Sequence, residues 1–261
     1  MGTKKITIHK ANELVRGGDK YSIFSKRLLN TLYLALQKAN AFNVDYITIP
    51  FASIRSYMGL EKEQNYVAIM KQSFEELQQP LQLNNFKDPR TGEEWHWFSC
   101  SFIDEVGFKK DESGRWVAKI RVNSLIKYLM SRQENFTKLE LIPYLNKMRT
   151  KYSMKLYEYL KSFSGFRYID IPQKHLMQLF GIDNNDKSYK NYANLKQLLK
   201  RQIEEIRKKT DLKEIKLQEA KVLAKEKKFR IIINPKAKRK VDDITAKQGI
   251  KQITQNLFKR F

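Results

Sequence analysis

Five polar side chains recur at helical spacing near residue 195: Lys190, Asn194, Gln197, Lys200 and Arg201. At 100° per residue the first three and Arg201 fall on one side of a helix, with Lys200 beside them. Arg and Lys can bond guanine O6 and N7, Asn and Gln can pair with adenine, and any of them can hold a phosphate. The pattern favours a surface that contacts DNA. The alternative is the solvated face of a surface helix, which is the commoner case for an isolated basic helix.

The opposite side of this helix is apolar and predicts how the helix is held. Its stripe consists of Leu195, Leu198, Leu199, Ile203 and Ile206. Upstream, residues 168–182 read as a short strand that ends in Pro172, followed by a helix that stops at Gly181. A polar connector then leads to the long basic helix. Together these elements predict a helix-turn-helix whose second helix can enter a DNA groove.

The same pattern occurs earlier in the chain. With a shift of 122 positions, YITIPFASIRSYMGL from Tyr46 lies over YIDIPQKHLMQLFGI from Tyr168. Further on the register shifts by seven, and the pair Glu75-Glu76 lies over Glu204-Glu205. The favoured interpretation is one structural module that occurs twice. The alternative is that two unrelated segments share a sequence pattern that is common in α+β proteins. In the first copy we expect a second helix over about 64–79, with Val67, Met70, Phe74 and Leu77 buried and with Asn65, Ala68, Gln72 and Glu76 pointing outward.

Apolar and polar residues alternate after each helix-turn-helix, and this pattern predicts strands that form a wing. In the first half we expect strands over 80–86, 95–106 and 116–122, separated by turn signals. In the second half, strands over 213–222 and 228–234 form a hairpin that carries Lys225, Lys227 and Arg230. These cations suit phosphate contacts on the flanking DNA backbone, and a hairpin that is merely soluble is the alternative.

The predicted fold class is therefore α+β, with two tandem winged-helix domains and an internal structural repeat. We place the first domain at residues 1–132 and the second at 133–261, with a basic C-terminal tail from 235. Two other helices are expected. One is capped by Ser25 and runs to about Ala39, and the other, with the sequence TKYSMKLYEYLKSF, stops at Gly165. The outward face of the first recognition helix, with Asn65 and Gln72, is far less basic than its counterpart. We expect the first domain to make weaker DNA contacts or to serve in protein contacts.

Composition points to a polyanionic partner. The 261 residues carry a net charge of +23, and the last 75 hold 23 Lys or Arg against 8 Asp or Glu. Nucleic acid and an anionic membrane both qualify, but no apolar run approaches the roughly 20 residues of a spanning helix. No signal peptide opens the chain, and Cys100 is the only cysteine. We therefore expect a cytoplasmic protein that does not associate with a membrane.

The residues that enzymes need are mostly missing. The sequence has no Gly-Lys dipeptide, which excludes a Walker A phosphate loop. Its three histidines, His9, His96 and His175, lie far apart, and a single cysteine excludes a zinc finger. Catalytic residues, metal ligands and cofactors are therefore not expected. We interpret the acidic pairs on the two recognition helices as structural, because adjacent helical residues diverge by 100°.

Several segments resemble one protein family. HKANELV, IFSKRLLNTLYLAL, ENFTKLELIPYL, YSMKLYEYLKSF and EEIRKKTDL are similar to segments of the iteron-binding theta-type plasmid replication initiators, the Rep proteins of the RepB, RepA and pi kind. The likeness covers about residues 6–234. Such proteins usually show an aromatic residue and consecutive basic residues near 194–197, whereas this chain has Asn-Leu-Lys-Gln there. The base-reading residues are therefore not carried over from the family.

The resemblance implies a plasmid-encoded bacterial protein without enzymatic activity. As a monomer it would bind direct repeats in origin DNA, help to melt the origin, and recruit the host replication initiator and the replicative helicase. As a dimer joined through its first domain it would bind an inverted repeat at its promoter and repress its own gene. The alternative from the residues alone is a winged-helix transcription regulator without a replication role. A nicking enzyme and a basic scaffold for RNA or membrane are the other classes considered.

Overall fold

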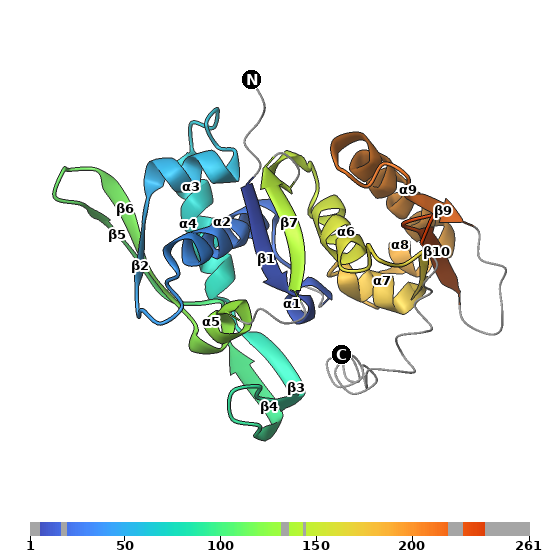
Figure 1. The fold of residues 1–261 in the computed structure, drawn as a ribbon, viewed down its shortest axis with the longest axis horizontal. Coiled ribbons are helices and arrows are strands. Elements are labelled where there is room, and N and C mark those ends of the chain that lie inside the picture. Colours follow the sequence, from blue (N-terminus) through green and yellow to red (C-terminus); the bar gives the residue numbers. More distant parts are fainter. Residues whose placement is uncertain (1–5, 17–19, 132–135, 143–144, 219–226, 238–261) are drawn as a thin grey trace.

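Two winged-helix domains lie on either side of a central two-stranded ribbon (Figure 1). The structure is a computed structural model that describes residues 6–16, 20–131, 136–142, 145–218 and 227–237. The winged-helix unit of the first domain is built on the helices α2 (Ile23–Ala39), α3 (Phe51–Met58) and α4 (Tyr66–Gln78). They pack on an antiparallel sheet with the strand order β2 (Ile47–Pro50), β6 (Trp116–Val122), β5 (Ile103–Lys110).

The second domain repeats this arrangement. Its helices are α6 (Lys151–Lys161), α7 (Gln173–Leu179), α8 (Lys187–Lys190) and α9 (Tyr192–Lys209). Its sheet has the order β8 (Tyr168–Pro172), β10 (Lys228–Ile232), β9 (Lys216–Gln218). The fold class predicted from the sequence is therefore confirmed, and the polar connector contains α8, a short helix that the sequence did not predict.

The internal repeat holds at the level of the backbone. Pro50 and Pro172 are both helix N-caps, with nearly identical dihedral angles of φ −58°, ψ 137° and φ −58°, ψ 145°. Gly59 is the C-cap of α3, and Gly181 follows Phe180, the C-cap of α7; both glycines are in the left-handed region, at φ 71° and 63°. Because side chains other than glycine are strained at such angles, glycine permits the turn that leads to the recognition helix.

The central ribbon joins the two halves of the chain. It consists of β1 (Ile6–Ala11) and β7 (Phe136–Ile142), which pair antiparallel, and α1 (Asn12–Arg16) and the 3-10 helix η1 (Leu145–Lys147) follow these strands. The ribbon therefore crosses the domain boundary that we predict at residue 132, which itself lies outside the described residues. That boundary stays a prediction.

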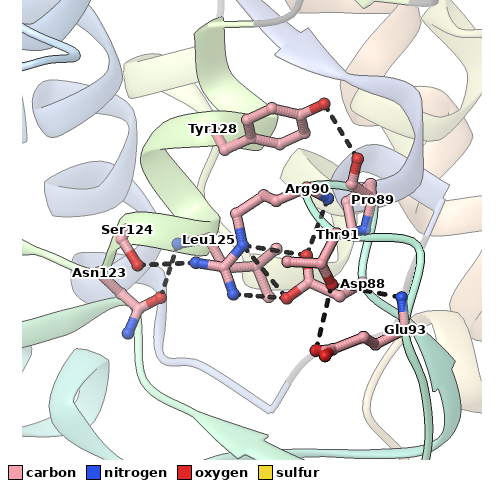
Figure 2. A network of polar contacts seen from close by, with 9 residues as sticks. All are labelled: Asp88, Pro89, Arg90, Thr91, Glu93, Asn123, Ser124, Leu125 and Tyr128. Atoms are coloured by element: carbon pink, nitrogen blue, oxygen red, sulfur yellow. Dashed lines mark hydrogen bonds and ion pairs between the residues drawn. The ribbon is translucent and has the colours of Figure 1, made fainter.

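The hairpin β3 (Leu81–Lys87) and β4 (Glu94–Cys100) projects from the first domain, and its turn is fastened to α5 (Ser124–Ser131). The buried Asp88 carboxylate accepts hydrogen bonds from Arg90, whose Nη1 also donates to Ser124 Oγ at 2.8 Å (Figure 2). Tyr128 adds a bond from its hydroxyl to the Pro89 carbonyl. Hydrogen bonds from the Arg90 side chain hold the pKa of Asp88 below its ordinary value, so the network stays charged near neutral pH.

Three local predictions were wrong. Residues 95–106 form two strands in different sheets, because the chain turns at Ser101 and buries Phe102 against Tyr21. Helix α2 begins at Ile23, where the Ser22 hydroxyl accepts a bond from the Ser25 backbone N–H and is the N-cap in place of Ser25. Helix α6 ends at Lys161, because Ser162 already takes the C-cap position ahead of Gly165.

Candidate nucleic-acid interface

Helix α9 presents the polar face expected from its sequence. Gln197, Lys200 and Arg201 are exposed, and none of them makes a hydrogen bond or ion pair with another described residue. All five residues of the apolar stripe are buried on the opposite side. Long donors that point into solvent from a firmly packed helix are available to a ligand, because no internal partner has to be given up first.

Hydrogen bonds connect the inner face of α9 to the start of α6. Gln202, almost fully buried, accepts a 2.6 Å hydrogen bond from Thr150 Oγ1, the N-cap of α6. Glu205 accepts from the Arg149 backbone N–H at 2.8 Å and from Lys209 Nζ at 2.6 Å. Burial alone would raise the pKa of Glu205, but these hydrogen bonds outweigh it and the pKa is lowered. The charged carboxylate is thus a structural fastener.

Glu76 has the equivalent role in the first domain. We expected it to point outward, but it accepts hydrogen bonds from the Ser22 backbone N–H at 2.8 Å and from Ser25 Oγ at 2.7 Å. In both domains a recognition-helix glutamate therefore binds the start of the helix that precedes the motif. These contacts agree with the structural interpretation of the acidic pairs.

Lys190, which we expected on the same helix as Asn194, is instead the last residue of α8, because the backbone is extended at Asn191 before α9 begins at Tyr192. Both Lys190 and Asn194 are exposed. The Asn194 amide donates to the Ser188 carbonyl at 2.9 Å, and Lys190 Nζ lies 3.5 Å from Asn185 Oδ1. Asn191 caps α9 through its side chain, which accepts from the Ala193 backbone N–H. The junction is thus ordered by local hydrogen bonds, and Asn194 keeps its carbonyl oxygen for an external donor.

The cations of the second wing have different surroundings. Lys227 is exposed, with its ammonium 5.8 Å from the centroid of the Tyr192 ring, which in turn stacks on Phe229 at 4.6 Å. Arg230 instead forms a two-bond ion pair with Asp170, at 2.7 and 2.6 Å, on the neighbouring strand. Lys225 lies outside the described residues. Of the two cations that the structure places, only Lys227 can meet a phosphate without breaking an ion pair.

One apolar residue of the first recognition helix lies differently from our prediction. Asn65 and Gln72 are exposed as expected, but Val67 is 45% exposed instead of buried. Tyr66 and Ile69 pack against the core in its place, together with the buried Met70, Phe74 and Leu77. Since both Val67 and Tyr66 fit an apolar period, the sequence did not show which of the two packs against the core.

The first wing carries cations that our prediction of the interface missed. Lys109, Lys110 and Lys119 are exposed on the hairpin of β5 and β6, which projects from the domain (Figure 1). Lys119 stands opposite Thr48, as Arg230 stands opposite Asp170 in the second domain. The internal repeat could have indicated Lys119, because Lys119 and Arg230 are equivalent positions when the two domains are aligned on β2 and β8.

The histidines that the structure describes on β4 and α7 lie apart. His175 packs against Tyr159, with ring centroids 5.9 Å apart, and burial lowers the pKa of His175. His96 is exposed on β4. Within the described ranges no three His, Cys, Asp or Glu side chains come together as a metal site would need. No helix there is both long and apolar enough to cross a membrane.

A helix-turn-helix followed by a β-hairpin, present twice around a central ribbon, defines a tandem winged-helix protein. Residues 7–161, more than half of the chain, match the family described as initiator replication protein, WH1. The chain belongs to this family of replication initiators. No curated protein sequence matches it.

Two solved structures have a similar fold. One is the crystal structure of Pi initiator protein in complex with iteron DNA, with a TM-score of 0.59 and 16% sequence identity over 89% of this chain and 99% of that chain. The other, domains 2 and 3 of RctB, has a TM-score of 0.50 and 12% identity over 82% of each chain. At these identities the likeness establishes the fold, and the site has to be argued from this chain's own residues.

Proposed function

We propose that this protein binds double-stranded DNA sequence-specifically and initiates replication of a bacterial plasmid from direct repeats in its origin. The observation that carries the proposal is the exposed face of α9, where Gln197, Lys200 and Arg201 stand without partners among the described residues. Membership of the initiator family supports the replication role. The bound iteron DNA of the similar Pi initiator supports direct repeats as the sites.

In this proposal α9 enters the major groove, whose width of about 12 Å admits an α-helix. Lys190, Asn194, Gln197, Lys200 and Arg201 contact base edges and phosphates there. Lys225 and Lys227 hold the flanking backbone, and Arg230 contributes only where Asp170 releases it. Asn65, the N-cap of α4, and Gln72 on α4 form the weaker reading set, to which the exposed lysines of the first wing add phosphate contacts.

The test is a titration of the full chain with duplex DNA that carries the repeats found beside its gene. Arg201→Ala should weaken binding by about 1–3 kcal/mol and relax selectivity at one base pair. Lys20→Ala is the control, because it removes one exposed positive charge ahead of α2, outside both helix-turn-helix motifs and both wings. If Arg201→Ala changed neither affinity nor selectivity, the assignment of α9 as the reading helix would be wrong.

We further propose a monomer–dimer equilibrium in which the dimer forms through the first domain, binds a promoter inverted repeat and represses the gene. The exposed side chains of Trp95 and Trp97, 43% and 58% accessible on β4, support a protein contact there. Sedimentation velocity over a range of concentrations measures the equilibrium. A Trp97→Ser variant that dimerised like the parent would place the contact elsewhere.

The remaining steps are origin melting and recruitment of the host initiator and replicative helicase in the cytoplasm, with no enzymatic step of the protein's own. The gene with its upstream repeats should sustain a plasmid that lacks an origin. A protein that binds the repeats but sustains no plasmid would be a transcription regulator. Incubation with supercoiled origin DNA and Mg²⁺ should leave it intact, and a nicked product would show catalysis.

A further inference from the structure

Buried polar contacts join the two winged-helix domains beside the β1–β7 ribbon. Lys10 Nζ, on β1, donates to Glu158 Oε1, on α6, at 2.6 Å. The two residues are only 5% and 4% exposed. From the same face of α6, the buried Lys155 ammonium donates to the Leu14 carbonyl at 3.2 Å. These contacts bridge about 140 residues of chain and leave little freedom for one domain to turn against the other.

Arg27 on α2 connects the first recognition motif to the second domain through a single planar group. Its Nη1 donates to the Met58 carbonyl at 3.0 Å, and its Nη2 donates to the Met148 carbonyl at 3.0 Å. Met58 is the last residue of α3, directly before the left-handed Gly59 that leads to α4. Met148 lies just before α6. A displacement of the second domain would therefore pull on the turn that positions α4.

Arg16 adds a third link at the other end of the interface. Its Nε donates to Ser162 Oγ at 3.2 Å and its Nη2 to the Ser162 carbonyl at 3.1 Å, while the guanidinium lies 4.2 Å from the Phe163 ring centroid. An isolated pair of strands is at best marginally stable. Buried charges tolerate only arrangements that satisfy them, because an unpaired buried charge is costly. The polar links, more than the ribbon, specify one arrangement of the domains.

We propose that Arg27 and the Lys10–Glu158 pair are positioning residues that set the distance and rotation between α4 and α9, and thereby the one spacing between the two halves of the DNA site that the protein accepts. The inference rests on the proposed DNA-binding function. Each inserted base pair moves one half-site by about 3.4 Å and turns it by roughly a tenth of a helical turn. A rigid pair of recognition helices cannot follow that movement.

The test compares DNA spacing preference in the full chain and in two variants. The probe is the duplex that the wild-type chain enriches from a random-sequence pool, together with derivatives that carry one or two extra base pairs between its halves. Arg27→Met removes both carbonyl contacts. Lys10→Met combined with Glu158→Leu removes the ion pair without leaving an unpaired charge. Isolated half-site duplexes and thermal unfolding are measured in parallel.

In wild type, one inserted base pair should weaken binding about tenfold or more, because simultaneous engagement of both halves is lost. In the variants the loss should shrink to within about threefold, while binding of either half-site alone stays unchanged. Equal spacing profiles in wild type and folded variants would overturn the proposal and leave DNA binding intact. If Arg27→Met fails to fold, the double variant and Arg16→Ala carry the same comparison. A pool from which wild type enriches no duplex would refute the proposed function itself.

Discussion

At the scale of single residues, some basic side chains form ion pairs within the protein and others are exposed to solvent. Arg230 is held by Asp170 and lies over the Tyr168 ring, 4.3 Å from its centroid. Lys227, directly before β10, is instead exposed beside Tyr192. Both are basic residues on β-type sequence. Only the neighbouring strand, with a carboxylate directly opposite Arg230, separates a sheet fastener from a candidate phosphate contact.

This division predicts the salt dependence of DNA binding. Lys227→Ala should weaken binding to all sequences alike and reduce the slope of log affinity against log salt by about one unit, because one phosphate contact and its released counterion are lost. Titrations at several salt concentrations with specific and random duplexes measure this slope. Lys20→Ala, which removes a charge outside both motifs and both wings, should leave it unchanged. A variant with an unaltered slope would remove Lys227 from the interface.

His175 predicts a pH effect on stability. Burial lowers its pKa from the ordinary 6.5, so the unfolded chain binds a proton that the folded chain resists. Its contribution to stability is complete above about pH 6.5 and is lost as the pH falls below that value. His175→Gln should make the thermal midpoint fall less steeply between about pH 7 and pH 5. The exposed His96→Gln variant is the control, and an equal slope in all three proteins would contradict the prediction.

At the scale of elements, the helix-turn-helix depends on a backbone conformation that the sequence already indicated. Gly59 and Gly181 take the same left-handed geometry in the two domains. Glu76 and Glu205 then fasten the two recognition helices to α2 and to the start of α6. In each motif a glycine permits the turn, and a glutamate attaches the recognition helix to the start of the helix that precedes the motif. Together they orient the exposed face.

Gly181→Ala should therefore lower the free energy of unfolding by about 1 kcal/mol, because an L-residue is strained in the left-handed region. Gly107→Ala is a suitable control, since Gly107 lies in strand β5, its φ is not positive and an added Cβ would meet no atom within 4 Å. Urea denaturation gives both values. Equal stability of the two variants would mean that the turn relaxes without cost.

At the scale of the whole molecule, two winged-helix domains act as one body because charged groups are buried between them. The pair Lys10–Glu158 connects β1 to α6, and Arg27 connects α2 to both the first motif and the second domain. Such contacts add little net stability relative to apolar packing, but they exclude other arrangements. Their use is thus better explained by geometry than by stability.

The single variant Lys10→Met should cost about 3–5 kcal/mol of unfolding free energy, because it leaves the Glu158 carboxylate buried without its partner. Adding Glu158→Leu should recover most of that loss, to within about 1 kcal/mol of wild type. Chemical denaturation of wild type and the two variants measures the three free energies of unfolding. Additive losses in the double variant would show that the pair does not act as a unit.

The sequence by itself determined the repeat, the two motifs and the polar face of α9. These are local signals, because helical periodicity, the Pro and Gly at the ends of the first helix and the apolar stripe are all written within about forty residues. The five buried residues of that stripe and the two left-handed glycines follow from them. Periodicity alone did not show that Val67 on α4 is exposed while Tyr66 packs against the core.

Only the tertiary structure decided which charges are free. Arg230 meets a partner 60 residues away and Lys10 one that is 148 residues away, and no local pattern predicts such pairs. The split of residues 95–106 into two strands has the same origin, since it depends on a core position for Phe102 that other segments create. Charge and periodicity are properties of a segment. Pairing and burial are properties of the contacts that folding brings together.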